Sequence, residues 1–299
     1  MKQEVHWLKT MGSSQSIEEY LMNGVLFINK ESGLTSRDVV NKICKIYHTK
    51  KVGHTGTLDP LATGVLVVCL GSYTKLVSQI TAYEKEYIAT MKLGILTDTG
   101  DVTGKIIKRD DKYPSEEKIR ECFAKFPKEY LQTVPKYSAV KVNGKKLYEY
   151  ARENIAVSLP KRQVQIKNLE ILDISKDEIT FQVCVSKGTY IRSLIEDLAK
   201  EMETVATMST LKRTKQGNIS LEECVNVNDL KENYPLKTIE NLFNYPKVKL
   251  DDINFERVKN GNKLSLEAKD DFVFVTYEDQ IVGLYKKDDD IYRFVFKTI

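Results

Sequence analysis

Short apolar runs and a helical pattern predict the first elements of the chain. Residues 25–28 and 65–70 are continuous apolar runs, which is typical of buried strands. Between them, apolar residues recur at the helical spacing of about 3.6, which predicts a helix capped by Thr35 or Ser36. The residues that define this helix are Val39, Val40, Ile43 and Ile46. A strand, a helix and a second strand therefore open the predicted fold.

Strands and helices continue to alternate as far as about residue 202. Period-two patterns predict strands, and apolar residues three and four apart predict helices. Strands are expected over 87–95, 164–171 and 179–185, and helices near 76–80 and over 115–126 and 191–202. In the second of these strands, the step from Ile166 to Leu169 breaks the alternation. Because the elements are mixed without a regular strand–helix–strand repeat, the sequence predicts an α+β fold.

Changes in residue composition and pattern divide the chain into three parts. Residues 1–23 are polar and serine-rich, and we interpret them as a disordered N-terminal extension outside the fold. A large domain is expected over residues 24–244. Residues 245–299 contain short strands separated by acidic turns, which predicts a small β domain.

Composition and charge narrow the class of protein. The 299 residues are 41% hydrophobic and 29% charged, which is typical of a folded soluble protein and excludes collagen-like and wholly disordered chains. The net charge of +4 is too small to predict nucleic-acid binding by itself. The stretch from Lys30 to Lys75, however, contains seven basic and three acidic residues, so the whole surplus of positive charge can be concentrated there.

Cysteine and histidine usage predicts neither disulfides nor a metal site. The five cysteines are dispersed, without a C-x-x-C pair, which favours reduced thiols. The three histidines lie in no ligand spacing, so no metal is expected. The N-terminus lacks a signal-peptide core, and no apolar run has the roughly 18 residues needed to span a bilayer. We therefore expect a cytoplasmic protein.

The loop GHTGTLDPLATG, residues 53–64, contains a single carboxylate, Asp59. The structural interpretation of Asp59 is an Asx-turn before Pro60, which is a common use of aspartate in loops. The functional interpretation is a nucleophile or base that neighbouring cations keep ionised. A phosphate-binding loop is disfavoured, because neither glycine-rich nucleotide motif occurs in the chain. The residues alone leave both interpretations of Asp59 open.

Five separate segments of the chain carry a family pattern. The segments are GVLFINKESGLTS, KKVGHTGTLDPLATGVLVVCLG, KEYIATMKLGILTDTGD, KYSAVKVNGKKLYEYAR and SKGTYIRSLIEDL. Taken together and in this order, they resemble the TruB family of bacterial tRNA pseudouridine-55 synthases, and the resemblance covers residues 24 to about 215. Two positions depart from the family pattern: Glu31 and Val134 each stand where the family usually has proline. Both departures lie outside the loop that contains Asp59 and affect local backbone rigidity.

The resemblance implies a fold and an activity. The fold is a pseudouridine synthase-type mixed β-sheet catalytic domain with flanking helices, followed by a small PUA-like RNA-binding domain. The activity is isomerisation of uridine 55 in the TΨC arm of tRNA, without a cofactor. The partner is therefore tRNA, and neither a membrane nor a metal takes part. The protein is expected to be a monomer.

The resemblance also implies the site residues. Asp59 resembles the catalytic aspartate, Tyr87 the tyrosine that stacks on the target base, and Arg192 the arginine paired with that aspartate. Three further residues resemble substrate contacts: His54, Tyr190 and Leu211. The target uridine must leave its folded RNA arm, and His54 would fill the gap. Without the resemblance, these positions have ordinary interpretations: core packing for the tyrosines and the leucine, and solvated positions for the arginine and the histidine.

Two alternative functions are compatible with the same residues. One is a non-catalytic RNA-binding or RNA-folding protein on the same scaffold, and the other is a uridine isomerase for another RNA. A basic cluster of Lys212, Arg213 and Lys215 predicts a solvated face, which would contact phosphates if it lay beside an RNA cleft. The C-terminal part has ten basic and eleven acidic residues from Lys247 onward, which does not predict a large electrostatic surface for RNA.

Overall fold

The computed structural model describes residues 22–298, and the chain divides into two compact units between Leu236 and Lys237. The division falls before the boundary at 244/245 that the sequence predicts. The predicted N-terminal extension lies outside the described residues, except for Met22 and Asn23. The side-chain oxygen of Asn23 accepts a hydrogen bond from the Ser72 amide at 2.5 Å, so the fold includes this position.

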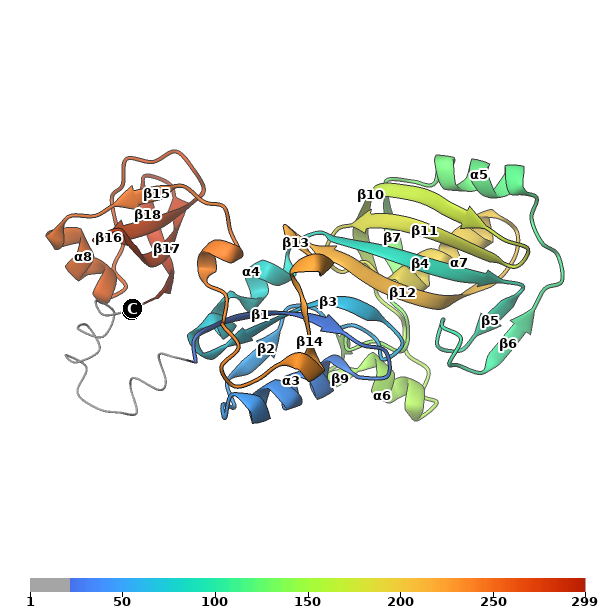
Figure 1. Cartoon of the computed structure of the whole chain (residues 1–299). Coiled ribbons are helices and arrows are strands. Elements are labelled where there is room, and N and C mark those ends of the chain that lie inside the picture. Colours follow the sequence, from blue (N-terminus) through green and yellow to red (C-terminus); the bar gives the residue numbers. More distant parts are fainter. Residues whose placement is uncertain (1–21, 299) are drawn as a thin grey trace. The chain divides into compact units, whose positions relative to one another are not determined.

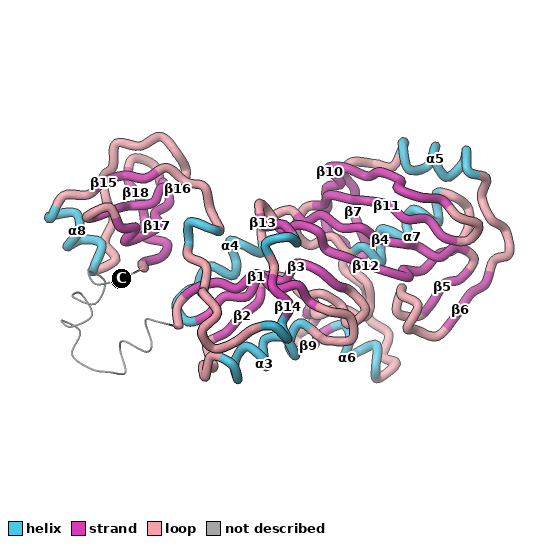
Figure 2. The backbone as a smooth tube through the Cα atoms, in the orientation of Figure 1, coloured by secondary structure: helices cyan, strands magenta, loops and turns pink. Residues whose placement is uncertain are grey.

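The first unit is built on one large mixed sheet (Figures 1 and 2). Its strand order is β14-β1-β3-β12-β4-β11-β10-β7, with β2 paired to β3 and β13 paired to β12. The strands are β1 Gly24–Lys30, β2 Val52–His54, β3 Thr63–Leu70, β4 Lys85–Leu93, β7 Glu129–Thr133, β10 Lys161–Ile174, β11 Glu178–Val185, β12 Ala206–Gln216, β13 Ile219–Ser220 and β14 Val225–Asn226. Two hairpins complete the unit: β5 Ile95–Thr97 with β6 Ile106–Arg109, and β8 Lys141–Val142 with β9 Lys145–Lys146.

Helices accompany this sheet, and their ends follow local sequence signals. They are α3 Ser36–Ile46, α4 Val77–Thr81, α5 Glu116–Lys125, α6 Leu147–Arg152 and α7 Ile191–Glu201. Thr35 caps α3 through a reciprocal capping box with Asp38, and Ser115 caps α5 by accepting from the Lys118 amide. The mixed sheet with flanking helices confirms the predicted α+β class.

A continuous apolar core joins the strands to α3, α5 and α7. Along β4 the positions of Tyr87, Ala89, Met91 and Leu93 are buried and alternate with less buried ones, as the period-two pattern predicts. In β10 the pairing register with β11 shifts between Ile166 and Asn168. This bulge explains why the sequence pattern loses its strict alternation there.

Strand β12 joins the two halves of the sheet. It pairs in parallel with β3, where Arg213 lies opposite Gly64, and antiparallel with β4, where Arg213 lies opposite Tyr87. The prediction of a solvated face was wrong for Arg213, whose side chain is only 1% exposed, and it holds for Lys212 and Lys215, which are exposed. Alternation places Arg213 on the buried face and Lys212 on the exposed one, and the register shift with β4 between Arg213 and Lys215 turns Lys215 outward.

The second unit has its own small core, and its strands confirm the predicted β character. The elements are β15 Lys247–Lys249, α8 Asp252–Lys259, β16 Phe272–Tyr277, β17 Gln280–Asp288 and β18 Ile291–Lys297. The strands form a sheet in that order, with β15 parallel to β16 and the other pairs antiparallel. The rings of Phe255 and Tyr277 stack at 3.9 Å and fix α8 on this sheet.

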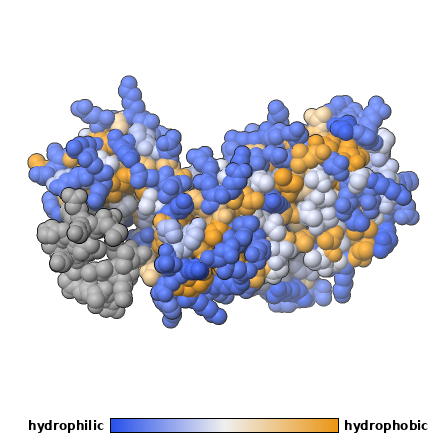
Figure 3. Space-filling model, in the orientation of Figure 1, coloured by the Kyte–Doolittle hydropathy of each residue, from blue (hydrophilic) through white to orange (hydrophobic). Residues whose placement is uncertain are grey.

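The surface drawn in Figure 3 is mostly hydrophilic, with hydrophobic areas between the polar side chains. Leu131 on β7, Ile107 on β6 and Leu172 on β10 are among the large apolar residues that remain exposed. Single exposed apolar residues are normal for a folded domain. Within residues 22–298, none of the helices combines the length and the apolar character that crossing a bilayer requires.

Candidate active site

Asp59 lies in the irregular loop between β2 and β3. The loop is fixed immediately before Asp59, because the Ser36 hydroxyl accepts from the Leu58 amide at 2.8 Å and donates to the Leu58 carbonyl at 3.1 Å. It is fixed after Asp59 by the Pro60 carbonyl, which accepts from the Gly33 amide at 2.8 Å. The segment that starts α3 therefore holds the backbone on both sides of this aspartate.

Arg192, the second residue of α7, pairs with Asp59. Its Nε lies 2.9 Å from Asp59 Oδ2, and its Nη2 donates to Oδ1 at 3.2 Å, which gives a two-pronged contact. The same guanidinium donates to the carbonyls of Thr99 at 2.9 Å and Tyr137 at 3.1 Å. The Arg192 side chain is 6% exposed, whereas that of Asp59 is 29% exposed. The carboxylate therefore has a fixed partner and an accessible side.

Opposing effects set the pKa of Asp59. Burial is the largest effect and raises the pKa, while the charge of Arg192 lowers it. The Asp101 charge raises the pKa further, Lys30 lowers it, and the net result is a pKa above the ordinary value of an aspartate. A desolvated carboxylate of this kind is a stronger base and nucleophile than one in water.

Lys30 is a buried cation of this site that the sequence pattern did not single out. Its ammonium donates to the carbonyls of Leu34 at 2.6 Å, Glu31 at 3.0 Å and Pro60 at 3.4 Å. Burial lowers the pKa of Lys30 to about 8, and the charge of Asp59 opposes this shift. In the sequence, Lys30 is one of several basic residues in the same stretch. No local signal distinguishes it from the lysines that are exposed.

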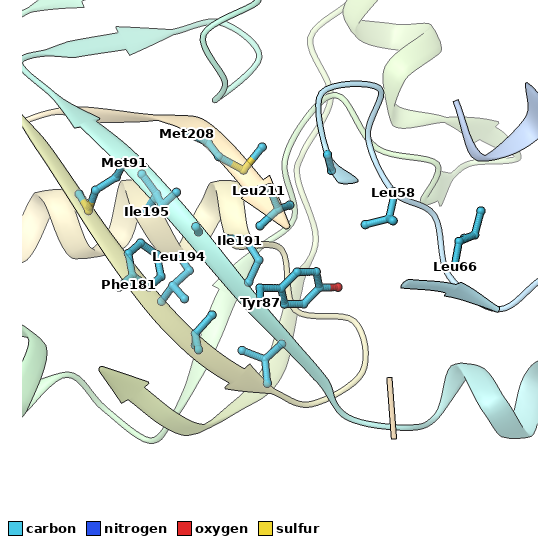
Figure 4. Packing of buried hydrophobic residues seen from close by; sticks show 14 of the residues in the cluster. Leu58, Leu66, Tyr87, Met91, Phe181, Ile191, Leu194, Ile195, Met208 and Leu211 are labelled. Carbon is cyan, nitrogen blue, oxygen red and sulfur yellow. The ribbon is translucent and has the colours of Figure 1, made fainter. Parts of the chain in front are cut away.

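Tyr87 extends from β4 into the apolar core beside the loop and α7. It is 6% exposed and belongs to one cluster with Leu58, Ile191 and Leu211, which include the chain neighbours of Asp59 and Arg192. Figure 4 shows the hydroxyl end of Tyr87 directed toward the side on which Leu58 and Leu66 lie. The structure thus brings the aromatic ring, the aspartate loop and the start of α7 to one region of the sheet.

Two of the remaining predicted substrate contacts, His54 and Tyr190, lie at the ends of elements that adjoin the Asp59–Arg192 pair, namely the end of β2 and the start of α7. His54 is half-buried at the end of β2, and burial together with the charges of Arg213 and Arg37 lowers its pKa, which keeps it neutral near pH 7. Tyr190 precedes α7, and its amide donates to the buried side chain of Gln132 at 2.8 Å.

Both residues that depart from the family pattern make contacts of their own. The Glu31 carboxylate accepts from the side-chain amide of Asn228 at 3.0 Å, which ties the end of β1 to a segment far along the chain. The amide of buried Val134 donates to the Pro160 carbonyl at 3.0 Å. A proline has no amide hydrogen and could not make the second contact.

The region combines four chemical groups. It presents one partly accessible carboxylate, the buried Arg192 guanidinium that pairs with it, the buried Lys30 ammonium that contacts its loop, and the aromatic ring of Tyr87. Within the described residues, no group of three His, Cys, Asp or Glu side chains is arranged to hold a metal ion. Asp59 is a carboxylate with one accessible side, next to a buried guanidinium.

Relatives with established names cover nearly the whole chain. The tRNA pseudouridine synthase B of Clostridium tetani is 41% identical over 92% of this chain and 99% of its own length. The enzyme of the same name from Fusobacterium nucleatum is 42% identical over 88% of this chain and 95% of its own. The matches therefore cover nearly the full length of both relatives.

Solved structures and family models agree with these relatives. The structure of an H/ACA ribonucleoprotein bound to a substrate RNA containing 2′-deoxyuridine matches with a TM-score of 0.69, at 26% identity, over 95% of this chain and 87% of that chain. An archaeal box H/ACA Nop10–Cbf5 complex matches with a TM-score of 0.68. The model of the TruB family pseudouridylate synthase N-terminal domain matches residues 44–191, and that of the tRNA pseudouridylate synthase B C-terminal domain matches residues 192–245. The chain therefore belongs to the TruB family of pseudouridylate synthases, which are isomerases.

Proposed function

We propose that this chain converts uridine 55 in the TΨC arm of tRNA to pseudouridine, with Asp59 as the catalytic residue and without a cofactor. The observation that carries the proposal is the Asp59–Arg192 pair, in which a buried guanidinium orients a partly accessible carboxylate. The names of the relatives support tRNA as the substrate. We further propose that the protein acts in the cytoplasm and as a monomer, since all of the residues named here belong to one chain.

The reaction is an isomerisation, so its atoms and electrons balance within the substrate and solvent. The N1–C1′ bond of the nucleotide breaks, the uracil turns, and a C5–C1′ bond forms. The C5 hydrogen leaves to solvent as a proton, and N1 takes up a proton from solvent. Asp59 supplies the nucleophile or base that starts this exchange. Tyr87 provides a flat face for the base, and the apolar cluster around it excludes water that would otherwise add at C1′ and release free uracil.

Access to the target requires that the uridine leave its stack, at a cost of a few kcal/mol. His54 is proposed to occupy the vacated position, because its neutral ring is flat and Lys50 and Lys51 are close to it in sequence. Tyr190 and Leu211 are proposed to contact the extruded nucleotide. The second unit is proposed to be a PUA-like domain that contacts the same RNA.

The proposal is tested with unmodified tRNA that carries tritium at uridine C5. The wild-type protein should release tritium, and sequencing of the product should place pseudouridine at position 55. Asp59→Asn should bind the tRNA and lose roughly 10²–10⁴-fold in single-turnover rate. Asp98→Asn is a matched control, because Asp98 accepts from the Lys105 amide and does not contribute to the pKa of Asp59.

Other results would favour the alternative functions. Release by Asp59→Asn at the wild-type rate would remove Asp59 from the chemistry. A protein that binds tRNA tightly but releases no tritium would be an RNA-binding or RNA-folding protein. Release from a different RNA, with position 55 unmodified, would make the chain a uridine isomerase for that RNA.

A further inference from the structure

Arg213 is a buried arginine to which the proposed function assigns no role. Its side chain is among the largest that are fully buried in the described structure. Nε donates to the Val65 carbonyl at 2.5 Å, and Nη2 donates to the Gly56 carbonyl at 3.1 Å. Within residues 22–298, no carboxylate forms a salt bridge with this guanidinium. The charge is therefore held by backbone carbonyl dipoles.

The two carbonyls belong to the two ends of the loop that contains Asp59. Gly56 lies three positions before Asp59, and Val65 is the third residue of β3 after the loop. A single rigid guanidinium thus bridges the entry and the exit of this loop. Because its donors have fixed directions, the bridge sets the separation of the two ends as well as their orientation.

The backbone of Arg213 fixes the same loop a second time. It pairs with Gly64, where φ is +100° and an added Cβ would lie 2.2 Å from the Arg213 carbonyl oxygen. Such a close approach is possible only for glycine. Three residues further along β12, the Gln216 side-chain amide donates to Thr55 Oγ1 at 2.8 Å, next to Gly56. Strand β12 therefore contacts both ends of the loop through side chains and backbone.

A buried charge without an ionic partner is an expensive way to hold a loop. Desolvation of a charged group costs several kcal/mol, and apolar packing of the same volume would stabilise the fold as well or better. Packing alone therefore does not explain an arginine at this position. What the guanidinium adds is geometry, because it makes two directional hydrogen bonds from one rigid group.

We propose that Arg213 is a positioning residue, which holds the loop ends so that Asp59 meets Arg192 in the geometry required for catalysis. The inference rests on the proposed role of Asp59. A small displacement of a reacting group costs roughly 10²-fold in rate, so a loosened loop should reduce the chemical step more than substrate binding.

The test uses the full-length protein with Arg213→Lys, which keeps the charge but replaces the fork by a point-like ammonium. Phe123→Leu is the matched control: it destabilises the same unit at α5, where Phe123 contacts Phe181, away from the loop. Three quantities are measured for each variant: single-turnover rate at saturating tRNA, tRNA dissociation constant, and hydrogen–deuterium exchange of peptides that cover residues 56–65. All measurements are made well below the melting temperature.

For Arg213→Lys we expect a rate at least about tenfold lower, a dissociation constant within about threefold of wild type, and faster exchange in the loop peptides. Phe123→Leu should lower the melting temperature without any of these changes. A wild-type rate in Arg213→Lys, whatever its melting temperature, would overturn the inference and leave Arg213 a purely structural residue. If Arg213→Lys does not fold, Arg213→Gln, which keeps one N–H donor group, is judged by the same criteria.

Asp59→Asn separates this inference from the proposed function. If Asp59→Asn is inactive and Arg213→Lys has the wild-type rate, only the positioning role fails. If Asp59→Asn itself retains the wild-type rate, the role of Asp59 fails, and the positioning role fails with it.

Discussion

Two aspartates in similar loops have opposite surroundings. Asp59 lies in a loop rich in threonine and glycine, and Asp101 lies in another, TDTGDVTG, between β5 and β6. One oxygen of Asp101 accepts from Thr99 Oγ1 at 3.0 Å, from the Thr103 amide at 3.0 Å and from Thr103 Oγ1 at 2.5 Å. Among the described residues, the donor groups that reach the Asp59 carboxylate all belong to Arg192.

The difference shows how a carboxylate that serves its own turn differs from one that keeps an accessible side. Asp101 satisfies its own turn, which is the Asx-type arrangement that sequence alone also allowed for Asp59. Among the described residues, no backbone amide donates to the Asp59 carboxylate, and Ser36 on another element instead holds the backbone of its neighbour Leu58. One side of the Asp59 carboxylate therefore remains accessible. The loops also cooperate, since the Thr99 carbonyl accepts from Arg192 and the Asp101 charge raises the pKa of Asp59.

Removal of the one donor to Asp59 should have the largest effect. Arg192→Met leaves a mostly buried carboxylate and the carbonyls of Thr99 and Tyr137 without their donor, so we expect a loss of about 3 kcal/mol in unfolding free energy. The single-turnover rate should fall by at least about 10²-fold. Urea unfolding and tritium release measure the two effects.

The matched control for that prediction is Arg120→Met. Arg120 pairs with Glu116 on the exposed face of α5, and both side chains are well exposed. Its removal should cost at most about 0.5 kcal/mol and leave the rate unchanged. Equal losses in the two arginine variants would mean that the Asp59 pair is an ordinary surface ion pair.

A smaller effect, on stability more than on rate, is expected for Asp101→Ala. The change removes the acceptor for the Thr103 amide and for two hydroxyl groups, which should lower the unfolding free energy by about 1–3 kcal/mol. The rate of the folded protein should fall far less than that of Asp59→Asn. A loss of activity as large as that of Asp59→Asn, with tRNA bound normally, would erase the distinction between the two aspartates.

The smallest effect is a shift in pH dependence. In its proposed role Asp59 acts in its ionised form, so its raised pKa predicts that activity is lost as pH falls through a value above that of an ordinary aspartate. Asp101→Asn keeps an oxygen acceptor for the turn but removes a charge that raises this pKa. The acidic limb of the single-turnover rate should therefore move to lower pH.

The control for the pH prediction is Asp98→Asn in the same loop. Asp98 does not contribute to the pKa of Asp59, so its profile should overlay that of the wild type. An acidic limb that moves to higher pH in Asp101→Asn would contradict the electrostatic coupling between the two loops.

The elements of the fold were predictable because their signals are local. Thr35 and Ser115 cap the expected helices, and alternation identifies β4 and β11. The sequence pattern did not predict strand β12, because Lys212, Arg213 and Lys215 indicated a solvated charged face. An arginine that is buried against carbonyls looks the same in a sequence as an arginine in solvent, since its partners are backbone atoms of distant residues.

The Asp59–Arg192 pair was predictable only through the resemblance to a family. No local pattern connects Asp59 with Arg192, and Asp59 by itself favoured a turn. Lys30 and Ser36, which hold the loop, occur in a matched segment, but the residue types alone do not reveal what they contact. These contacts form between residues that are far apart in the sequence, so they become visible only in the folded structure.

The distance along the chain between Asp59 and Arg192 has a consequence for synthesis. The two residues are separated by 133 positions. At roughly 5–20 residues per second, a ribosome adds Arg192 about 7 to 27 s after Asp59, and Arg213 follows later. A growing polypeptide therefore carries Asp59 for many seconds before the guanidinium that pairs with it exists. If the proposed role of this pair is right, the first unit gains activity only near the end of its translation.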